Sequence, residues 1–164
     1  MNPRERILAI LNREPVDRMP VDLWHTPEIE DLLMQHTGAG DDFEMWQRLN
    51  LDKIVWVFMD YRSGADEVSG SQVGALAMGQ RTMWGVPLQD VEAGVAHYQE
   101  AVASPLLGVE SPAELDDYPY WPDPERFEYA AAMDLAQKAL DHDFAVIGPW
   151  VSFFEIYSQL RGIE

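Results

Sequence analysis

The sequence contains no cysteine, and this absence excludes both a disulfide framework and a metal site built from thiolates. It also lacks an apolar run of about 18 residues, the length that a membrane-spanning helix needs. The first residues lead into an amphipathic helical pattern, not into the apolar core of a signal peptide. We therefore expect a cytoplasmic protein.

Positive charge is scarce. The chain carries 11 Lys and Arg residues against 29 Asp and Glu residues, a formal net charge of −18. Such a surface repels phosphate backbones and anionic lipids, so we expect neither nucleic acid nor a membrane as a partner. A polycarboxylate substrate fits this charge only if the few arginines are focused into one pocket.

Several catalytic motifs are also missing. The sequence has no His-x-Glu-x-His spacing, no Gly-x-Gly-x-x-Gly loop, no P-loop and no Gly-x-Ser-x-Gly elbow. What it does contain is 47% apolar residues, which is enough to build the core of one domain.

Hydrophobic periodicity predicts alternating helices and strands. Helices are expected at 3–11, with Asn2 and Glu5 as a capping box, and at 27–36, 42–49, 125–141 and 152–160. Gly38 is expected to end the second helix, and Asp41 to cap the third. Helical spacing predicts that three of these helices bury apolar faces: Ile7, Leu8, Ile10 and Leu11 in the first, Ile29, Leu32 and Leu33 in the second, and Phe127, Ala131, Leu135 and Leu140 in the helix 125–141. Short apolar runs predict buried strands at 20–24, 54–59 and 144–147. Glycines between 64 and 102 punctuate alternating segments, which is typical of hairpins. The expected fold is α/β, with about three parallel strands and an inserted hairpin region.

Candidate functional residues follow from the strand ends, where β/α proteins place their reactive groups. The predicted catalytic residues are His25, Asp60, Glu155 and Tyr157, and the predicted substrate-binding residues are Trp24, Tyr61, Trp84 and Trp150. We predict no metal ligands.

Each candidate has a structural alternative. His25 is a proton donor or metal ligand, or it is bonded to a loop. Asp60 is a partly desolvated carboxylate, or it caps a turn. Glu155 is a buried acid, or it interacts with a helix dipole, which its place in a first turn favours. Trp84, Trp121 and Trp150 line a pocket for a tetrapyrrole or another aromatic molecule, or they are core residues.

The motifs and their order resemble the N-terminal half of the superfamily that holds uroporphyrinogen decarboxylase and the corrinoid-dependent methyltransferases. The resemblance is carried by the opening 4–24, Leu51-Asp52-Lys53-Ile54-Val55, Met83-Trp84-Gly85-Val86-Pro87, the connector 116–124, and Leu160-Arg161-Gly162-Ile163-Glu164. It implies a (β/α)8 TIM barrel, which typically takes about 250 residues. We therefore expect residues 1–164 to be the N-terminal portion of such a barrel, truncated.

The branches of this superfamily differ in the sequence of the loop that follows the first strand. Decarboxylases of the family carry an Arg-Gln-Ala-Gly-Arg motif there, whose arginines bind substrate carboxylates. This chain has His25-Thr26-Pro27-Glu28-Ile29 instead. The family's essential aspartate matches Asp60 only with one inserted residue, and its tyrosine falls at Glu155, two positions before Tyr157. The resemblance thus favours the methyltransferase branch; a decarboxylase (lyase) homologue and a non-catalytic half-barrel module that binds or oligomerises remain as alternatives.

The resemblance also implies cofactors and partners. Relatives in the methyltransferase branch bind zinc through histidine and cysteine in their C-terminal half, so we expect zinc and corrinoid only in a longer parent and no cofactor in this chain. The expected partners are a small molecule or a corrinoid protein, together with a second copy in a homodimer or a missing C-terminal half.

Overall fold

The computed structural model describes residues 1–62, 81–94, 96–149 and 152–163. These residues form two compact units. The first comprises Met1–Val57 and Met133–Gly148, and the second comprises Phe58–Ala132 and Pro149–Glu164. The architecture is mixed α/β, as the sequence predicts.

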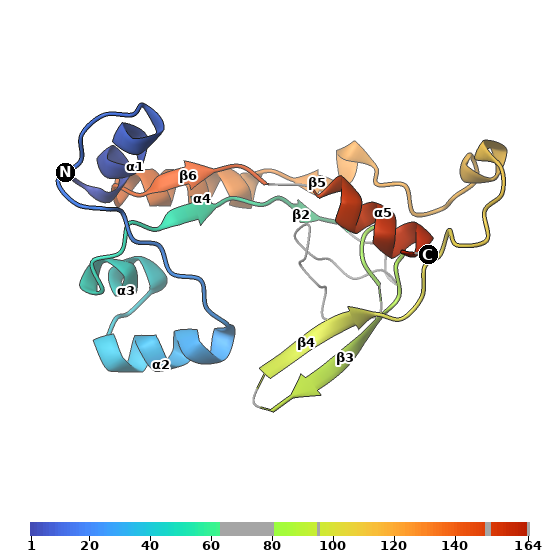
Figure 1. Ribbon diagram of the computed structural model, residues 1–164, viewed down its shortest axis with the longest axis horizontal. Helices are drawn as coiled ribbons and strands as arrows, with labels where there is room; N and C mark the ends of the chain where they lie inside the picture. Colours follow the sequence, from blue (N-terminus) through green and yellow to red (C-terminus); the bar gives the residue numbers. More distant parts are fainter. Residues whose placement is uncertain (63–80, 95, 150–151, 164) are drawn as a thin grey trace. The chain divides into compact units, whose positions relative to one another are not determined.

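The first unit is organised around two parallel strands. β1 (Ile54–Trp56) pairs with β6 (Ala145–Ile147), with Val55 opposite Val146. The two strands run side by side in the same direction (Figure 1). The backbone N–H of Val57 continues the ladder by donating to the carbonyl of Ile147 at 2.9 Å. This pairing confirms the parallel relationship that the two apolar runs predict.

Helix α1 (Pro3–Leu11) begins at the predicted capping box. The Asn2 side chain accepts from the Glu5 backbone N–H at 2.7 Å, and the Glu5 carboxylate accepts from the Asn2 N–H at 2.9 Å. The Arg4 N–H donates to the Asp143 carbonyl at 2.8 Å, which fastens α1 to the turn before β6. The expected apolar face is wrong in detail, because Arg6 and Ala9 are the residues that α1 buries.

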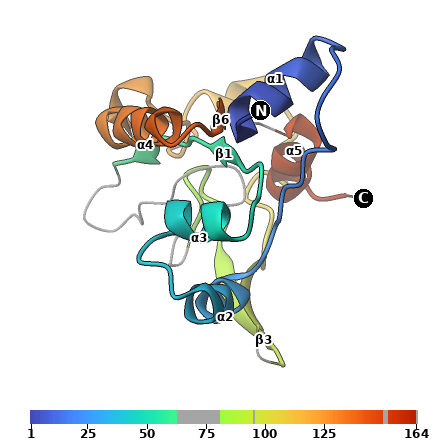
Figure 2. The same ribbon diagram turned by 90° about the vertical axis from the view of Figure 1, so that its left-hand side faces the viewer.

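Helices α2 (Pro27–Thr37) and α3 (Asp42–Arg48) form as predicted and lie beside each other (Figures 1 and 2). Gly38 ends α2 in the left-handed conformation, with φ +65°, and Asp41 caps α3. The expected inward face of α2 is wrong, since Ile29 and Leu32 are exposed and the helix buries none of its residues.

An aromatic cluster forms the core of the first unit. Phe43 and Trp46 of α3 pack against Phe144, with ring centroids 6.0 and 5.6 Å from the Phe144 ring. Ala139, on helix α4 (Ala130–Asp141), is fully buried as well. The prediction that α4 buries Leu135 and Leu140 is wrong, since both side chains are exposed.

Two predicted elements are corrected. Residues 20–24 form no strand, because their backbone bonds to Asp52 and Lys53 instead of to a neighbouring ladder. The long helix starts at Ala130, not at 125: Pro124–Arg126 forms the 3-10 turn η2, and Phe127–Glu128 forms β5. Among the described residues the parallel sheet therefore has two strands instead of three, and no barrel is formed.

The second unit contains two antiparallel pairs. β2 (Asp60–Tyr61) pairs with β5, and β3 (Leu88–Ala93) pairs with β4 (Ala96–Ala101) in a hairpin. This hairpin confirms part of the predicted hairpin region; residues 63–80 lie outside the described residues. The predicted strand 54–59 is shorter in the structure, since β1 ends at Trp56 and residues 57–59 belong to no strand.

The core of the second unit gathers segments that are distant in sequence. Val86, Leu106 and Leu160 are buried together, Leu160 lying on helix α5 (Phe153–Arg161). Leu115, at the end of the 3-10 turn η1 (Pro112–Leu115), packs against them. No helix in the described part of the chain is both long and apolar enough to cross a membrane.

Candidate functional site

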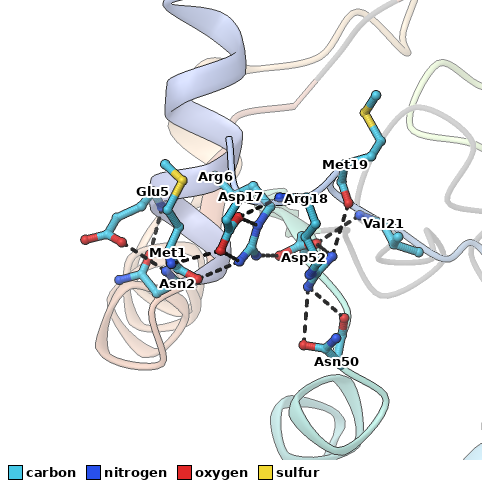
Figure 3. A network of polar contacts seen from close by, with 10 residues as sticks. All are labelled: Met1, Asn2, Glu5, Arg6, Asp17, Arg18, Met19, Val21, Asn50 and Asp52. Atoms are coloured by element: carbon cyan, nitrogen blue, oxygen red, sulfur yellow. Dashed lines mark hydrogen bonds and ion pairs between the residues drawn. The ribbon is translucent and has the colours of Figure 1, made fainter. Parts of the chain in front are cut away.

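An ion-pair network in the first unit contains two arginines of the N-terminal segment (Figure 3). The Asp52 carboxylate is completely buried and accepts from Arg6, from Arg18 Nη1 at 2.5 Å and from the Val21 N–H at 2.9 Å. Asp52 thus joins the start of β1 to α1 and to the segment after it.

Asp17 completes this network. Its carboxylate accepts from Arg6 Nε at 2.7 Å and Nη2 at 2.9 Å, and it pairs with the Met1 ammonium at 3.0 Å. The hydrogen bonds from Arg6 and the Met1 ammonium hold the pKa of Asp17 well below its usual range. The pKa of Arg6 is raised in turn, chiefly by its hydrogen bond to Asp17 and further by its hydrogen bond to Asp52. Both arginines are therefore committed to internal carboxylates.

Trp24, a predicted substrate-binding residue, presents its ring to solvent with 68% of the residue exposed. Its ring packs edge-on against Trp56 at 6.0 Å, and Lys53 Nζ lies 5.2 Å from its centroid. Lys53 also pairs with Asp22 at 3.0 Å. An exposed indole with a neutralised cation beside it suits a flat uncharged surface better than an anion.

His25, a predicted catalytic residue, is largely buried, with 11% of its side chain exposed. Its Nδ1 has no hydrogen-bond partner in the described part of the chain and lies 3.6 Å from Glu30 Oε2. The pKa of Glu30 is raised, mainly by burial and then by the charge of Asp42. An imidazole that faces a carboxylate with a raised pKa is the kind of residue pair that can transfer a proton.

The two residues expected after the second strand have different environments. Asp60 is exposed, so the prediction that it is desolvated is wrong; it lies on the short pair β2–β5 and not at the end of a buried strand. Tyr61 is 5% exposed, and its hydroxyl accepts from the Asp123 N–H at 3.0 Å. Its ring packs edge-on against Phe127 at 5.0 Å, so its contacts are those of a core residue.

The remaining candidates belong to the second unit. Trp84 packs on the core cluster, and its carbonyl accepts from the Tyr118 hydroxyl at 2.6 Å. Glu155 lies in the first turn of α5, where its N–H donates to Ser152 Oγ at 3.2 Å, which favours the helix-dipole interpretation. Tyr157 is 61% exposed. Trp150 lies outside the described residues.

A cavity of about 350 Å3 adjoins Tyr157. It is lined mainly by apolar groups, and its walls include Leu106, Val109, Leu115, Trp121, Tyr157 and Arg161. Arg161 is a site residue that the sequence does not reveal, because a cation near the end of a predicted helix is ordinary. Its contact with the segment 106–109 depends on tertiary structure alone.

The described residues do not fit the zinc that the resemblance implies. The chain has no cysteine, and no three His, Asp or Glu side chains of the described ranges form a group able to hold a metal ion. The cavity lies at the low end of the roughly 300–1,000 Å3 typical of small-molecule sites, which is small for a corrin or tetrapyrrole ring.

The candidates divide between the two units. Trp24 and His25 belong to the first unit, whereas Asp60, Tyr61, Trp84, Glu155 and Tyr157 belong to the second.

Comparisons with protein-family models, with curated proteins and with solved structures found no match to the chain. Functional inference therefore rests on the residues themselves.

Proposed function

We propose that the chain belongs to an enzyme of the uroporphyrinogen decarboxylase-like and corrinoid methyltransferase superfamily, and that it serves methyl transfer. The observation that carries the proposal is the parallel pair β1–β6, in which β6 directly follows helix α4. This is the local order of a β/α barrel unit. It adds to the ordered motifs, which include the Trp84-Gly85 turn and the connector 116–124.

The finer architecture that we propose is a (β/α)8 barrel. Parallel strands are normally covered on both faces and paired on both edges. In the pair β1–β6, Val55 is buried but Ile147 is 41% exposed. Strands from outside the described residues, supplied by further chain or by a second copy, would complete the sheet.

Methyl transfer is favoured over decarboxylation in part because two arginines that precede the predicted first loop are already paired with carboxylates of the chain. Uroporphyrinogen carries eight carboxylates, and binding it requires free arginines that can grip them in pairs. In the first unit Arg6 and Arg18 are bound to Asp17 and Asp52, and Lys53 is paired with Asp22. The exposed ring of Trp24 is better suited to an uncharged flat face, such as that of a corrinoid.

Within this proposal His25 is the residue for proton transfer. Its Nδ1 faces Glu30 without a hydrogen bond, so the pair can exchange a proton after a small rotation of either side chain. Asp60 and Tyr157 remain candidates, since both are exposed where a substrate can reach them.

Equilibrium dialysis of the full chain against methylcobalamin and, under anaerobic conditions, against uroporphyrinogen tests the proposal. We expect methylcobalamin to be retained, and Trp24→Ala to weaken its retention. Met19→Ala, which removes another exposed apolar side chain of the same segment, should leave retention unchanged. Retention of uroporphyrinogen with no retention of the corrinoid would overturn the proposal.

A second candidate function is favoured by one observation. Phe153 and Phe154 of α5 are 85% and 73% exposed, and Ile163 just after the helix is 82% exposed. Such a surface is typical of a binding or oligomerisation module without catalysis. The oligomeric state of the chain, measured by light scattering, tests this second function.

A further inference from the structure

The cavity beside α5 has walls suited to a small flat apolar molecule. Leu106, Val109 and Leu115 provide aliphatic surface, and Trp121 and Tyr157 provide aromatic surface. A volume of about 350 Å3 accommodates a molecule of one or two rings. Shape and lining therefore favour an aromatic ligand.

The Trp121 ring is held in place before any ligand arrives. Its Nε1–H donates to the Leu115 carbonyl at 2.8 Å, and its ring packs edge-on against Tyr118 and Trp84, with centroids 5.3 and 6.4 Å away. Trp121 is nevertheless 45% exposed, so part of it stays accessible. A fixed aromatic surface loses little conformational entropy on binding.

Arg161 places one fixed cation at the cavity. Its Nη1 group donates to the Leu106 carbonyl at 2.7 Å and to the Val109 carbonyl at 2.6 Å. Within the described ranges its Nε–H and Nη2–H groups have no hydrogen-bond partner. These two groups form the side of a guanidinium that grips a carboxylate with two parallel hydrogen bonds.

The acidic groups nearby limit the ligand to one negative charge. Glu110 also lines the cavity and is exposed, so it repels a second anionic group at the rim. Glu114 is occupied by Ser111, whose hydroxyl and N–H both donate to its carboxylate at 2.8 Å. From these contacts we infer that the cavity is a binding site for a small planar aromatic monocarboxylate. This inference does not depend on methyl transfer.

The test is a titration of the full 15N-labelled chain with 2-naphthoate, followed by amide chemical shifts. Shifts are expected in residues 106–115 and at the Trp121 indole, and not in β3. The neutral analogue 2-naphthamide should bind at least about tenfold more weakly, because it cannot take the two charge-assisted hydrogen bonds. Equal binding of the two probes, or millimolar 2-naphthoate without shifts in 106–115, would overturn the inference.

Two variants sharpen this test. Val109→Phe fills the cavity and should abolish binding, whereas Leu107→Phe changes a neighbouring exposed side chain that does not line the cavity and should leave binding intact. Arg161→Lys keeps the charge but loses the planar pair of donors, so it should weaken 2-naphthoate and not 2-naphthamide. If Val109→Phe unfolds, the shift map of the unmodified chain still decides. A negative result here leaves the corrinoid dialysis result standing on its own.

Discussion

Asp52 is the residue on which the first unit most depends. It is fully buried and binds two arginines and a backbone N–H. Asp52→Asn leaves Arg18 without a carboxylate partner and Arg6 with Asp17 alone, and breaking a buried pair in this way costs about 3–5 kcal/mol. We expect the free energy of unfolding measured in urea to fall by about that amount.

The control for Asp52 is the exposed pair of Glu44 and Arg48, joined on α3 at 2.5 Å. Glu44→Gln should lower the free energy of unfolding much less than Asp52→Asn does, since solvent screens the charges of an exposed pair. Equal losses from the two substitutions would contradict a special role for Asp52.

Asp17 makes stability depend on pH. Its pKa is lowered in the folded chain by Arg6 and the Met1 ammonium, so its contribution is complete above its unfolded pKa of about 4 and is lost as the pH falls further. Asp17→Asn should therefore lower the urea midpoint at pH 7 and have a diminishing effect from pH 4 to pH 2. A difference between the two proteins that stays constant over this range would contradict the ion pair.

At the scale of elements, the turn at Gly85 should tolerate no side chain. Gly85 has φ +79°, and a Cβ there would lie 2.4 Å from Tyr120 Cδ2 and 2.8 Å from the Tyr118 hydroxyl. Gly94 offers a matched control, with φ +66° and nothing within 4 Å. Gly94→Ala should cost about 1–2 kcal/mol of backbone strain, and Gly85→Ala clearly more. Equal changes in urea midpoint would contradict this.

The contact between α2 and α3 carries a repulsive pair of carboxylates. The pKa of Glu30 is raised by burial and by Asp42, so the folded state is favoured when Glu30 is protonated and loses that advantage as the pH rises through this pKa. Glu30→Gln should raise the urea midpoint slightly at pH 7, with the gain vanishing near pH 4. Glu14→Gln, at an exposed position after α1, is the control. A gain that persists at pH 4 would contradict the explanation.

At the scale of the whole molecule, exposed apolar side chains predict weak stability or association. Leaving a few hundred Å2 of apolar surface in water forfeits several kcal/mol at roughly 25 cal/mol per Å2, against a usual total of about 5–15 kcal/mol. We expect light scattering to show oligomers, or the dye ANS to bind a monomer. Phe153→Ser combined with Phe154→Ser should reduce both signals. A dye-silent monomer that melts above about 65 °C would contradict this expectation.

Local signals predicted the helix boundaries well. The capping box of Asn2 and Glu5, the left-handed Gly38 and the Asp41 cap each act over a few residues, so they can be read from the chain alone. The predicted start at 125 failed because pairing of Phe127 with Tyr61, which is distant in sequence, overrode the helical pattern.

The candidate site was predictable only in part. The predicted strand ends indicated Trp24 and His25. In the structure the Trp24 ring packs edge-on against Trp56, and the buried Nδ1 of His25 has no hydrogen-bond partner among the described residues. The desolvation of Asp60 was predicted wrongly. The apolar run 54–59 does not reveal that the hydrogen-bonded strand β1 ends at Trp56, before it reaches Asp60. Arg161 was missed because its partners are backbone carbonyls of residues 106 and 109.

The sequence by itself determined the mixed α/β class, the caps of its helices and the parallel pairing of the runs near 55 and 146, since these depend on periodicity and local hydrogen bonds. Only the tertiary structure decided which residues are buried and which polar groups find partners. Arg6, on the face of α1 that looks polar, is buried because Asp17 and Asp52 surround it. Ile29 and Leu32, apolar and correctly spaced, are exposed because no described element covers that face of α2. Burial depends on what packs against an element, and that information lies outside the element's own sequence.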